Sequence, residues 1–80
     1  MYKLYIIKCS DGSLYTGIAR DLDKRLETHR QGLGSKYVRA RLPFSLVYTE
    51  DCKNRSVATK REIEIKHMDR KTKLKLINNS

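Results

Sequence analysis

The N-terminal segment has the hydrophobic pattern of a β-hairpin. Residues 3–9 and 13–18 are rich in β-branched and aromatic side chains, and Ser10-Asp11-Gly12 between them has turn chemistry. The pattern leaves the loop length open. A two-residue loop would place Tyr5 and Tyr15 on opposite faces, whereas a three-residue loop with Gly12 in the left-handed conformation would place both on one face.

A helix and a basic loop follow the hairpin. Asp21 is a suitable N-cap, an apolar i, i+4 pair follows it, and Gln31-Gly32 is a typical helix end, so we predict a helix over 21–31. Arg25 and His29 lie four residues apart and are therefore neighbours on this helix. We interpret residues 32–41 as a basic loop with a short helical turn.

The C-terminal half predicts one strand and two helices. The segment Phe44–Thr49 reads as a strand that begins after Pro43, and Asn54 or Ser56 can cap a helix that ends near Met68. One arc of that helix contains Val57, Ala58, Arg61, Ile65 and Met68, and a short final helix carries Leu74 and Ile77. The order ββαβαα predicts an α+β fold with antiparallel pairing in its hairpin.

Length and composition limit the number of domains, the possible membrane spans and the state of the cysteines. Eighty residues suffice for one core, so we expect a single domain over 1–80. No apolar stretch approaches the roughly 20 residues that span a bilayer, and we expect a cytoplasmic protein. The two cysteines and two histidines lack zinc-site spacing, which favours buried free thiols at Cys9 and Cys52.

The net charge indicates the partner. Eighteen Lys and Arg against nine Asp and Glu leave +9, which favours a polyanion such as nucleic acid; solubility alone is the alternative interpretation. The excess gathers in two runs, one with Arg30, Lys36, Arg39 and Arg41 and one with Lys66, Arg70, Lys71, Lys73 and Lys75.

Two strand tyrosines, a helical Arg and His, and a helix carboxylate suit phosphodiester cleavage. That reaction needs a group that orients or deprotonates water, a cation for the transition state and a carboxylate for a divalent metal. Glu62 and Glu64 flank opposite edges of the apolar arc, and periodicity cannot choose between them. The Gly32-x-Gly34-x-Lys36 segment lacks the spacing of a phosphate-binding loop.

The motifs resemble those of GIY-YIG nucleases, in the form of the small stand-alone bacterial UPF0213 proteins. The similarity covers nearly the whole chain through three segments, which are Lys3 to Gly17, Gly32 to Pro43 and Ala58 to Lys66. The motifs read KLY and YTG here instead of GIY and YIG, and they keep both tyrosines and the glycine. The resemblance implies a three-stranded antiparallel sheet flanked by helices, and metal-dependent hydrolysis of DNA.

Roles for individual residues follow from this resemblance. Tyr5 would activate water, Tyr15 would shape the site, Arg25 would bind phosphate, His29 matches the histidine one turn later, and Glu62 would hold Mg²⁺ or Mn²⁺. The residues expected to contact nucleic acid are Gly17, Lys36, Tyr37, Arg39, Arg41 and Lys66. If both tyrosines act on one phosphate, the hairpin loop has three residues.

The expected function is a metal-dependent endonuclease acting on structured or damaged DNA in repair or recombination, with RNA as an open alternative substrate. A protein partner would supply specificity. The alternative is a non-catalytic nucleic-acid-binding module that uses the basic loop and Tyr37. An enzyme needs Mg²⁺ and Glu62 for turnover, whereas a binding module keeps its affinity without either.

Overall fold

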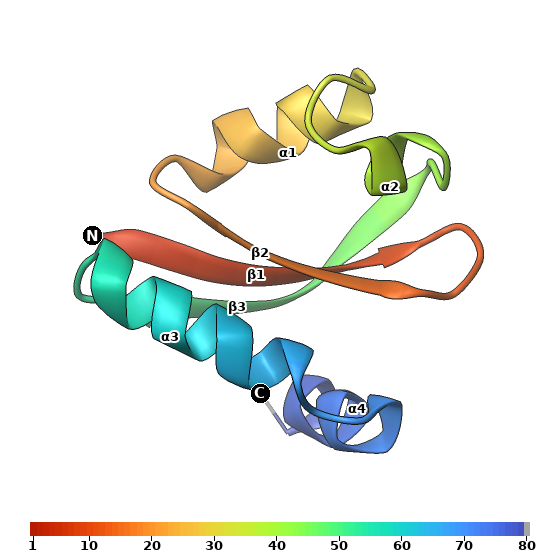
Figure 1. The fold of residues 1–80 in the computed structure, drawn as a ribbon. Helices are drawn as coiled ribbons and strands as arrows, with labels where there is room; N and C mark the ends of the chain where they lie inside the picture. Colours follow the sequence, from red (N-terminus) through yellow and green to blue (C-terminus); the bar gives the residue numbers. More distant parts are fainter. Residues whose placement is uncertain (80) are drawn as a thin grey trace.

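A three-stranded antiparallel sheet with helices on both faces forms the structure, a computed structural model that describes residues 1–79 (Figure 1). The strands are β1 (Tyr2–Cys9), β2 (Leu14–Ala19) and β3 (Phe44–Cys52), in the order β2-β1-β3. The helices are α1 (Leu22–Arg30), α2 (Lys36–Arg39), α3 (Arg55–Lys66) and α4 (Arg70–Asn78). The predicted order ββαβαα is confirmed, and α2 is the short helical turn expected in residues 32–41.

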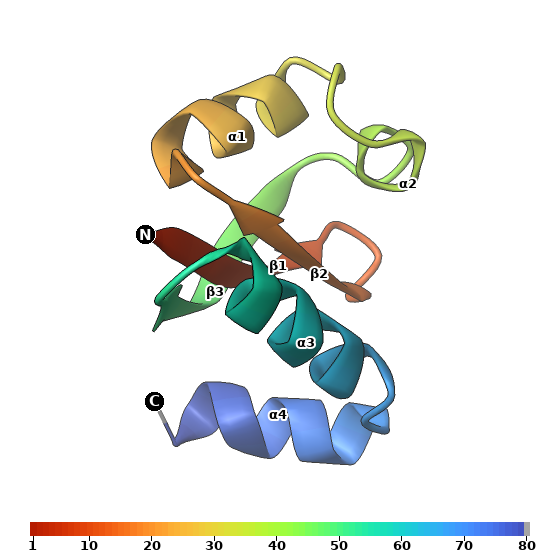
Figure 2. The ribbon, with the colours of Figure 1, turned by 60° about the vertical axis from the view of Figure 1, so that its left-hand side comes forward.

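The helices divide between the two faces of the sheet. Helices α1 and α2 cover one face, while α3 and α4 lie on the other, and both views show this separation (Figures 1 and 2). Alternate residues of β1 therefore enter different cores. Leu4 and Ile6 pack toward α3, whereas Tyr5 and Ile7 pack toward α1 and α2. Because both faces of β1 are covered, it reads in the sequence as a nearly continuous apolar run.

The hairpin has the three-residue loop. Ile7 pairs with Tyr15 and Tyr5 with Gly17. Gly12 has φ = +84°, a left-handed conformation that glycine adopts without steric cost. This register brings Tyr5 and Tyr15 to the α1–α2 face, as joint action on one phosphate requires.

Polar caps fix where the helices begin. The Asp21 carboxylate accepts a hydrogen bond from the Lys24 amide at 3.1 Å, and the Asn54 side chain accepts one from the Val57 amide at 2.9 Å. Asn54, and not Ser56, therefore caps α3. Helix α1 ends before Gly32, whose φ of +77° confirms the predicted stop.

The predicted third strand was too short. It continues from Thr49 to Cys52 because Tyr2, Lys3 and Leu4 of β1 offer partners to its last residues. This extension carries Glu50, whose charge no alternating hydrophobic pattern would assign to a strand.

The predicted apolar arc of α3 was wrong at one edge. Val57 is 46% exposed, whereas Ala58 and Ile65 are fully buried and Met68 packs against their cluster. The buried arc is therefore rotated away from Val57 and toward Glu62. Cys9 and Cys52 are buried free thiols, as expected. No helix within residues 1–79 combines the length and the apolar character needed to cross a membrane.

Candidate active site

Two tyrosines and a histidine gather where α1 crosses the sheet. The Tyr5 hydroxyl lies 2.9 Å from His29 Nε2, and both side chains are buried. The Tyr15 ring meets His29 edge-on, with centroids 5.7 Å apart. Strand β1, strand β2 and helix α1 thus each supply one ring to a single cluster.

Two glycines make room for this hydrogen-bonded pair. A Cβ atom at Gly17 would lie 2.5 Å from the Tyr5 hydroxyl oxygen, and one at Gly34 would lie 2.5 Å from His29 Nδ1. Cβ atoms in proteins essentially never approach that closely. The backbone of β2 therefore closes on Tyr5 from one side, and the loop before α2 closes on His29 from the other.

Burial and charge set the protonation states of the pair. Burial, with the nearby Tyr15, raises the pKa of the Tyr5 phenol; Arg25 lowers it and Glu62 raises it further. Burial and the Arg25 guanidinium lower the pKa of His29 below its ordinary 6.5. At neutral pH a neutral phenol therefore faces a neutral imidazole. Nε2 of that imidazole can accept the phenol proton, while Nδ1 is buried without a hydrogen-bond partner.

Arg25 is placed to act on an anion. It lies one helical turn before His29, is solvent-exposed, and makes no ion pair with any carboxylate in residues 1–79. Its charge nevertheless influences both Tyr5 and His29. Neither Glu27, which pairs with Arg30, nor Asp21, which caps α1, neutralises it.

The structure separates the two candidate carboxylates. The Glu62 side chain is only 20% exposed, lies on α3, which packs against β2 and β1, and has the smallest effect among the charges that shift the pKa of Tyr5. Glu64 is 62% exposed and pairs with Arg61. Only Glu62 therefore belongs electrostatically to the tyrosine–histidine cluster.

A single carboxylate fits a hard divalent ion that keeps several waters. Within residues 1–79 no group of three or more His, Cys, Asp and Glu side chains is arranged to hold a metal. Mg²⁺ commonly uses one or two carboxylates, substrate phosphate and water. Glu62 suits that pattern, and in this structure its carboxylate faces the Lys66 ammonium at 3.2 Å.

Comparisons with known proteins give the family of this chain. The family model described as the GIY-YIG catalytic domain matches residues 1–75. The chain belongs to the GIY-YIG family. It is 53% identical over 75 residues to a UPF0213 protein of Staphylococcus saprophyticus, with 94% of this chain and 92% of that protein covered. A UPF0213 protein of Staphylococcus aureus strain Mu50 is 54% identical over 74 residues, with 92% and 90% covered.

A solved structure shows the same fold. The solution NMR structure of the UPF0213 protein BH0048 from Bacillus halodurans has a TM-score of 0.66 and 41% sequence identity, and the alignment covers all of this chain and 86% of that one. GIY-YIG domains form a nuclease family, whose substrate is DNA. The matched range includes Tyr5, Tyr15 and Gly17, the residues expected to carry the two motifs of that family.

The residues expected to contact nucleic acid fall into two groups. Lys36 and Arg39 are exposed on α2, and no carboxylate in residues 1–79 pairs with them. Arg41 instead pairs with Asp11 at 3.0 Å and lies 3.8 Å over the Tyr37 ring, which stacks on Tyr15. Tyr37 and Arg41 therefore pack against the tyrosine–histidine cluster through Tyr15.

Two further members of the predicted set have other contacts. Gly17 is buried against Tyr5, so its visible contribution to the GIY-YIG site is steric. Lys66 pairs with Glu62, which places its charge beside the candidate metal ligand.

Arg61, which the sequence placed on the apolar arc of its helix, joins α3 to β3. Its Nε donates to Glu50 Oε1 at 2.9 Å, and this contact ties α3 to β3. Its guanidinium also pairs with Glu64 on the same helix. Burial would raise the pKa of Glu50, but hydrogen bonds from Arg61 and Tyr48 outweigh it and lower the pKa. An arginine on the apolar arc of a helix was the one available signal, because such a side chain needs a buried partner.

Proposed function

We propose that the protein is a metal-dependent endonuclease that hydrolyses phosphodiester bonds in DNA. The observation that carries this proposal is the hydrogen bond between Tyr5 and His29, with the charges of Arg25 and Glu62 acting on the same phenol. These groups correspond to what hydrolysis of a phosphodiester needs, which is a proton acceptor for water, a cation and a metal ligand.

Tyr5 and His29 move the proton together. In the tautomer of neutral His29 that carries its proton on Nδ1, Nε2 accepts from the Tyr5 hydroxyl, and the phenol oxygen can still accept a hydrogen bond from the attacking water. As the water oxygen bonds to phosphorus, its proton passes to Tyr5 while the phenol proton passes to Nε2 of His29. This relay avoids a free phenolate, which the raised pKa of Tyr5 disfavours.

Arg25 and Glu62 handle the negative charge. The unpaired guanidinium of Arg25 stabilises the charge that builds on the phosphate oxygens. Glu62 would hold Mg²⁺ or Mn²⁺, which supplies Lewis-acid stabilisation of the phosphate and the leaving oxygen when bound. Tyr15 packs on the edge of His29 and holds that ring in place.

The substrate class is branched or damaged DNA, processed in repair or recombination. Branched DNA is the first substrate of this class to test. A net charge of +9 supports contact with several phosphates at once. A protein partner would select the site of action, and we place the reaction in the cytoplasm.

Two observations favour a non-catalytic binding module as the second candidate. In this structure Lys66 neutralises Glu62, and Tyr5 is 2% exposed. A protein locked in that state would bind nucleic acid through its basic surface without turnover.

The experiment that separates the two candidates is a cleavage panel. Labelled branched, flapped, single-stranded and duplex substrates are incubated with and without Mn²⁺, with Glu62→Gln protein purified in parallel as a control for contaminating nucleases. The proposal requires Mn²⁺-dependent product from at least one substrate, absent with Glu62→Gln. Tight binding without any product from well-folded protein would support the binding module.

A further inference from the structure

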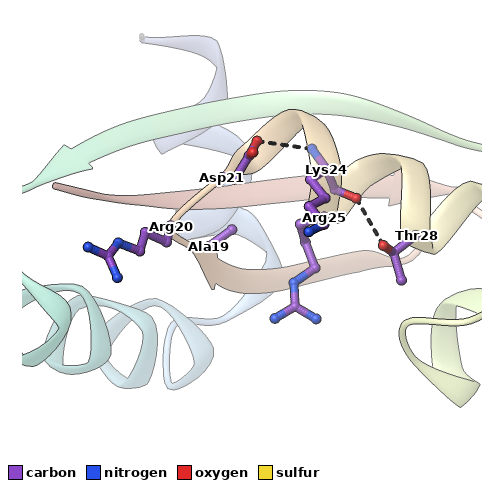
Figure 3. Close-up of a pocket in the computed structure, with 6 residues that line it drawn as sticks. All are labelled: Ala19, Arg20, Asp21, Lys24, Arg25 and Thr28. Atoms are coloured by element: carbon purple, nitrogen blue, oxygen red, sulfur yellow. Dashed lines mark hydrogen bonds between the residues drawn. The ribbon is translucent and has the colours of Figure 1, made fainter.

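A basic cavity opens beside the reaction centre, at the connection between β2 and α1. It has a volume of about 270 Å³ and is lined by Ala19, Arg20, Asp21, Lys24, Arg25 and Thr28 (Figure 3). Three of these six side chains are cationic and lie within six consecutive residues. The cavity is therefore a local concentration of positive charge, apart from the basic loop at residues 32–41.

The polar groups of opposite or neutral character in the cavity are already used. The Asp21 carboxylate turns back onto the first turn of α1, where it accepts from the Lys24 amide, and the Thr28 hydroxyl donates to the Lys24 carbonyl oxygen at 2.9 Å (Figure 3). By contrast, neither Arg20 nor the Lys24 ammonium forms an ion pair within the described part of the chain. The charge that remains available for a ligand is positive.

Several other cations of the protein are neutralised within the fold. Acidic partners face Lys3, Arg30, Arg41, Arg61 and Lys66. An unneutralised Arg–Lys–Arg set around a cavity favours an anion, and the planar guanidinium matches the paired oxygens of a phosphate. Three cations against the single carboxylate of Asp21 leave the lining with a net positive charge.

Arg25 connects this cavity to the reaction centre. It lines the cavity, and its charge also acts on Tyr5 and His29. The guanidinium groups of Arg20 and Arg25 do not converge on one point (Figure 3). This divergence suits two phosphates in succession better than one phosphate held by both.

We propose that the cavity binds the DNA phosphate that flanks the reacting one, with Arg20 and Lys24 as substrate-positioning residues. This inference rests on the proposed nuclease function, because it assigns the reacting phosphate to Arg25. Two consecutive phosphates held at fixed points set which bond of the strand lies at Tyr5. Arg20 and Lys24 therefore act on substrate placement, and Arg25 acts on the chemical step.

The test scans the substrate for the phosphate that the cavity binds. Single neutral methylphosphonate linkages are placed in turn along a fluorescent DNA that the protein binds, and affinity is measured by anisotropy without divalent metal. Wild-type protein loses affinity at several positions. The Arg20→Gln/Lys24→Gln variant should lose about 10-fold on unmodified DNA, and one position that weakens wild type at least 5-fold should become silent, less than 2-fold, in the variant.

A charge-matched control is Lys71→Gln/Lys75→Gln, which removes two exposed cations from α4 on the opposite side of the sheet. It should keep the wild-type profile at the position that Arg20→Gln/Lys24→Gln silences. Both substituted side chains are exposed, and the single variants Arg20→Gln and Lys24→Gln provide the same scan if the double variant unfolds. A well-folded variant that shows the wild-type profile at every position would overturn the proposal.

Cleavage mapping tells this failure from failure of the proposed function. If wild-type protein cuts the DNA, the silent position should be next to the cut. If it cuts nothing, the nuclease assignment fails, while the affinity scan still decides whether the cavity holds a phosphate. A silent position remote from a mapped cut would contradict the flanking-phosphate assignment.

Discussion

Replacing Gly17 by alanine should disable the site through the one atom it adds. Its Cβ would lie 2.5 Å from the Tyr5 hydroxyl oxygen and 2.6 Å from Cζ, so the phenol or β2 must move by about 0.5 Å to reach even the 3.0 Å limit. The Tyr5 ring is buried and cannot swing away freely. Overpacking of this kind costs about 1 to 3 kcal/mol. For a domain of this size, each kcal/mol lowers Tm by about 4 to 8 °C.

The same displacement acts on the proton relay. It perturbs the 2.9 Å hydrogen bond between Tyr5 and His29, and a misplacement of about half an ångström predicts a loss of roughly 10-fold to 10²-fold in cleavage rate. Circular dichroism gives the Tm, and single-turnover cleavage below the transition gives the rate.

Gly12→Ala is the matched control for Gly17→Ala. Gly12 has φ = +84° and no atom within 4 Å of the added Cβ, so alanine there costs about 1 to 2 kcal/mol of backbone strain without touching Tyr5. It should lower Tm by a similar amount and leave the cleavage rate unchanged. A Gly17→Ala protein that melts and cleaves like wild type would refute the steric account of this glycine.

Two further predictions concern pH and salt. Burial and Arg25 lower the pKa of His29 below 6.5, so the folded protein resists protonating this side chain. The resulting contribution to the free energy of unfolding is fully present above about pH 6.5 and falls as pH drops toward the lowered pKa. Urea titrations of His29→Gln should lack this pH dependence. Cleavage should fall as pH drops through the lowered pKa of folded His29, because protonated His29 cannot accept the phenol proton, and a flat pH–rate profile would contradict the relay. Neutralising Lys36 and Arg39 should reduce the magnitude of the log–log salt slope for duplex DNA by about 2, and adding Arg41→Gln should change it little because Asp11 already faces that charge. A slope that changes only when Arg41 is replaced would assign the binding surface differently.

Local signals in the sequence were enough to predict most of the fold. Asp21 as a cap and Gly32 as a stop placed α1 within one residue at each end, because both act through the backbone of their own turn. The hairpin register, unlike the ends of α1, did not follow from local signals. Gly12 permits either loop, and only the packing of Tyr5 and Tyr15 against α1 selects the longer one.

The choice between Glu62 and Glu64 shows the limit of periodicity. Arg61 of α3 pairs with Glu50, a β3 residue eleven positions earlier. No pattern within the helix reports that contact, so Val57 was assigned to a core it does not enter. The resemblance to GIY-YIG nucleases supplied Glu62, and the structure gives a physical reason for it.

Partners of exposed charges were also beyond the sequence. Lys66 and Arg41 looked like free cations for a nucleic acid, and each faces a carboxylate in the fold, at Glu62 and Asp11. Those contacts depend on how helix and hairpin meet, which composition does not specify.

The measurement that tests the central claim most directly compares Glu62→Gln with Glu64→Gln. Both changes remove one charge from α3 and keep side-chain shape, but only Glu62 acts on Tyr5. With Mn²⁺ and a substrate identified in the panel, single-turnover cleavage by Glu62→Gln should fall by orders of magnitude while its DNA affinity persists or rises. Glu64→Gln should cleave at close to the wild-type rate, because its exposed pair with Arg61 contributes at most about 1 kcal/mol. Wild-type cleavage by Glu62→Gln together with loss of cleavage in Glu64→Gln would contradict the account.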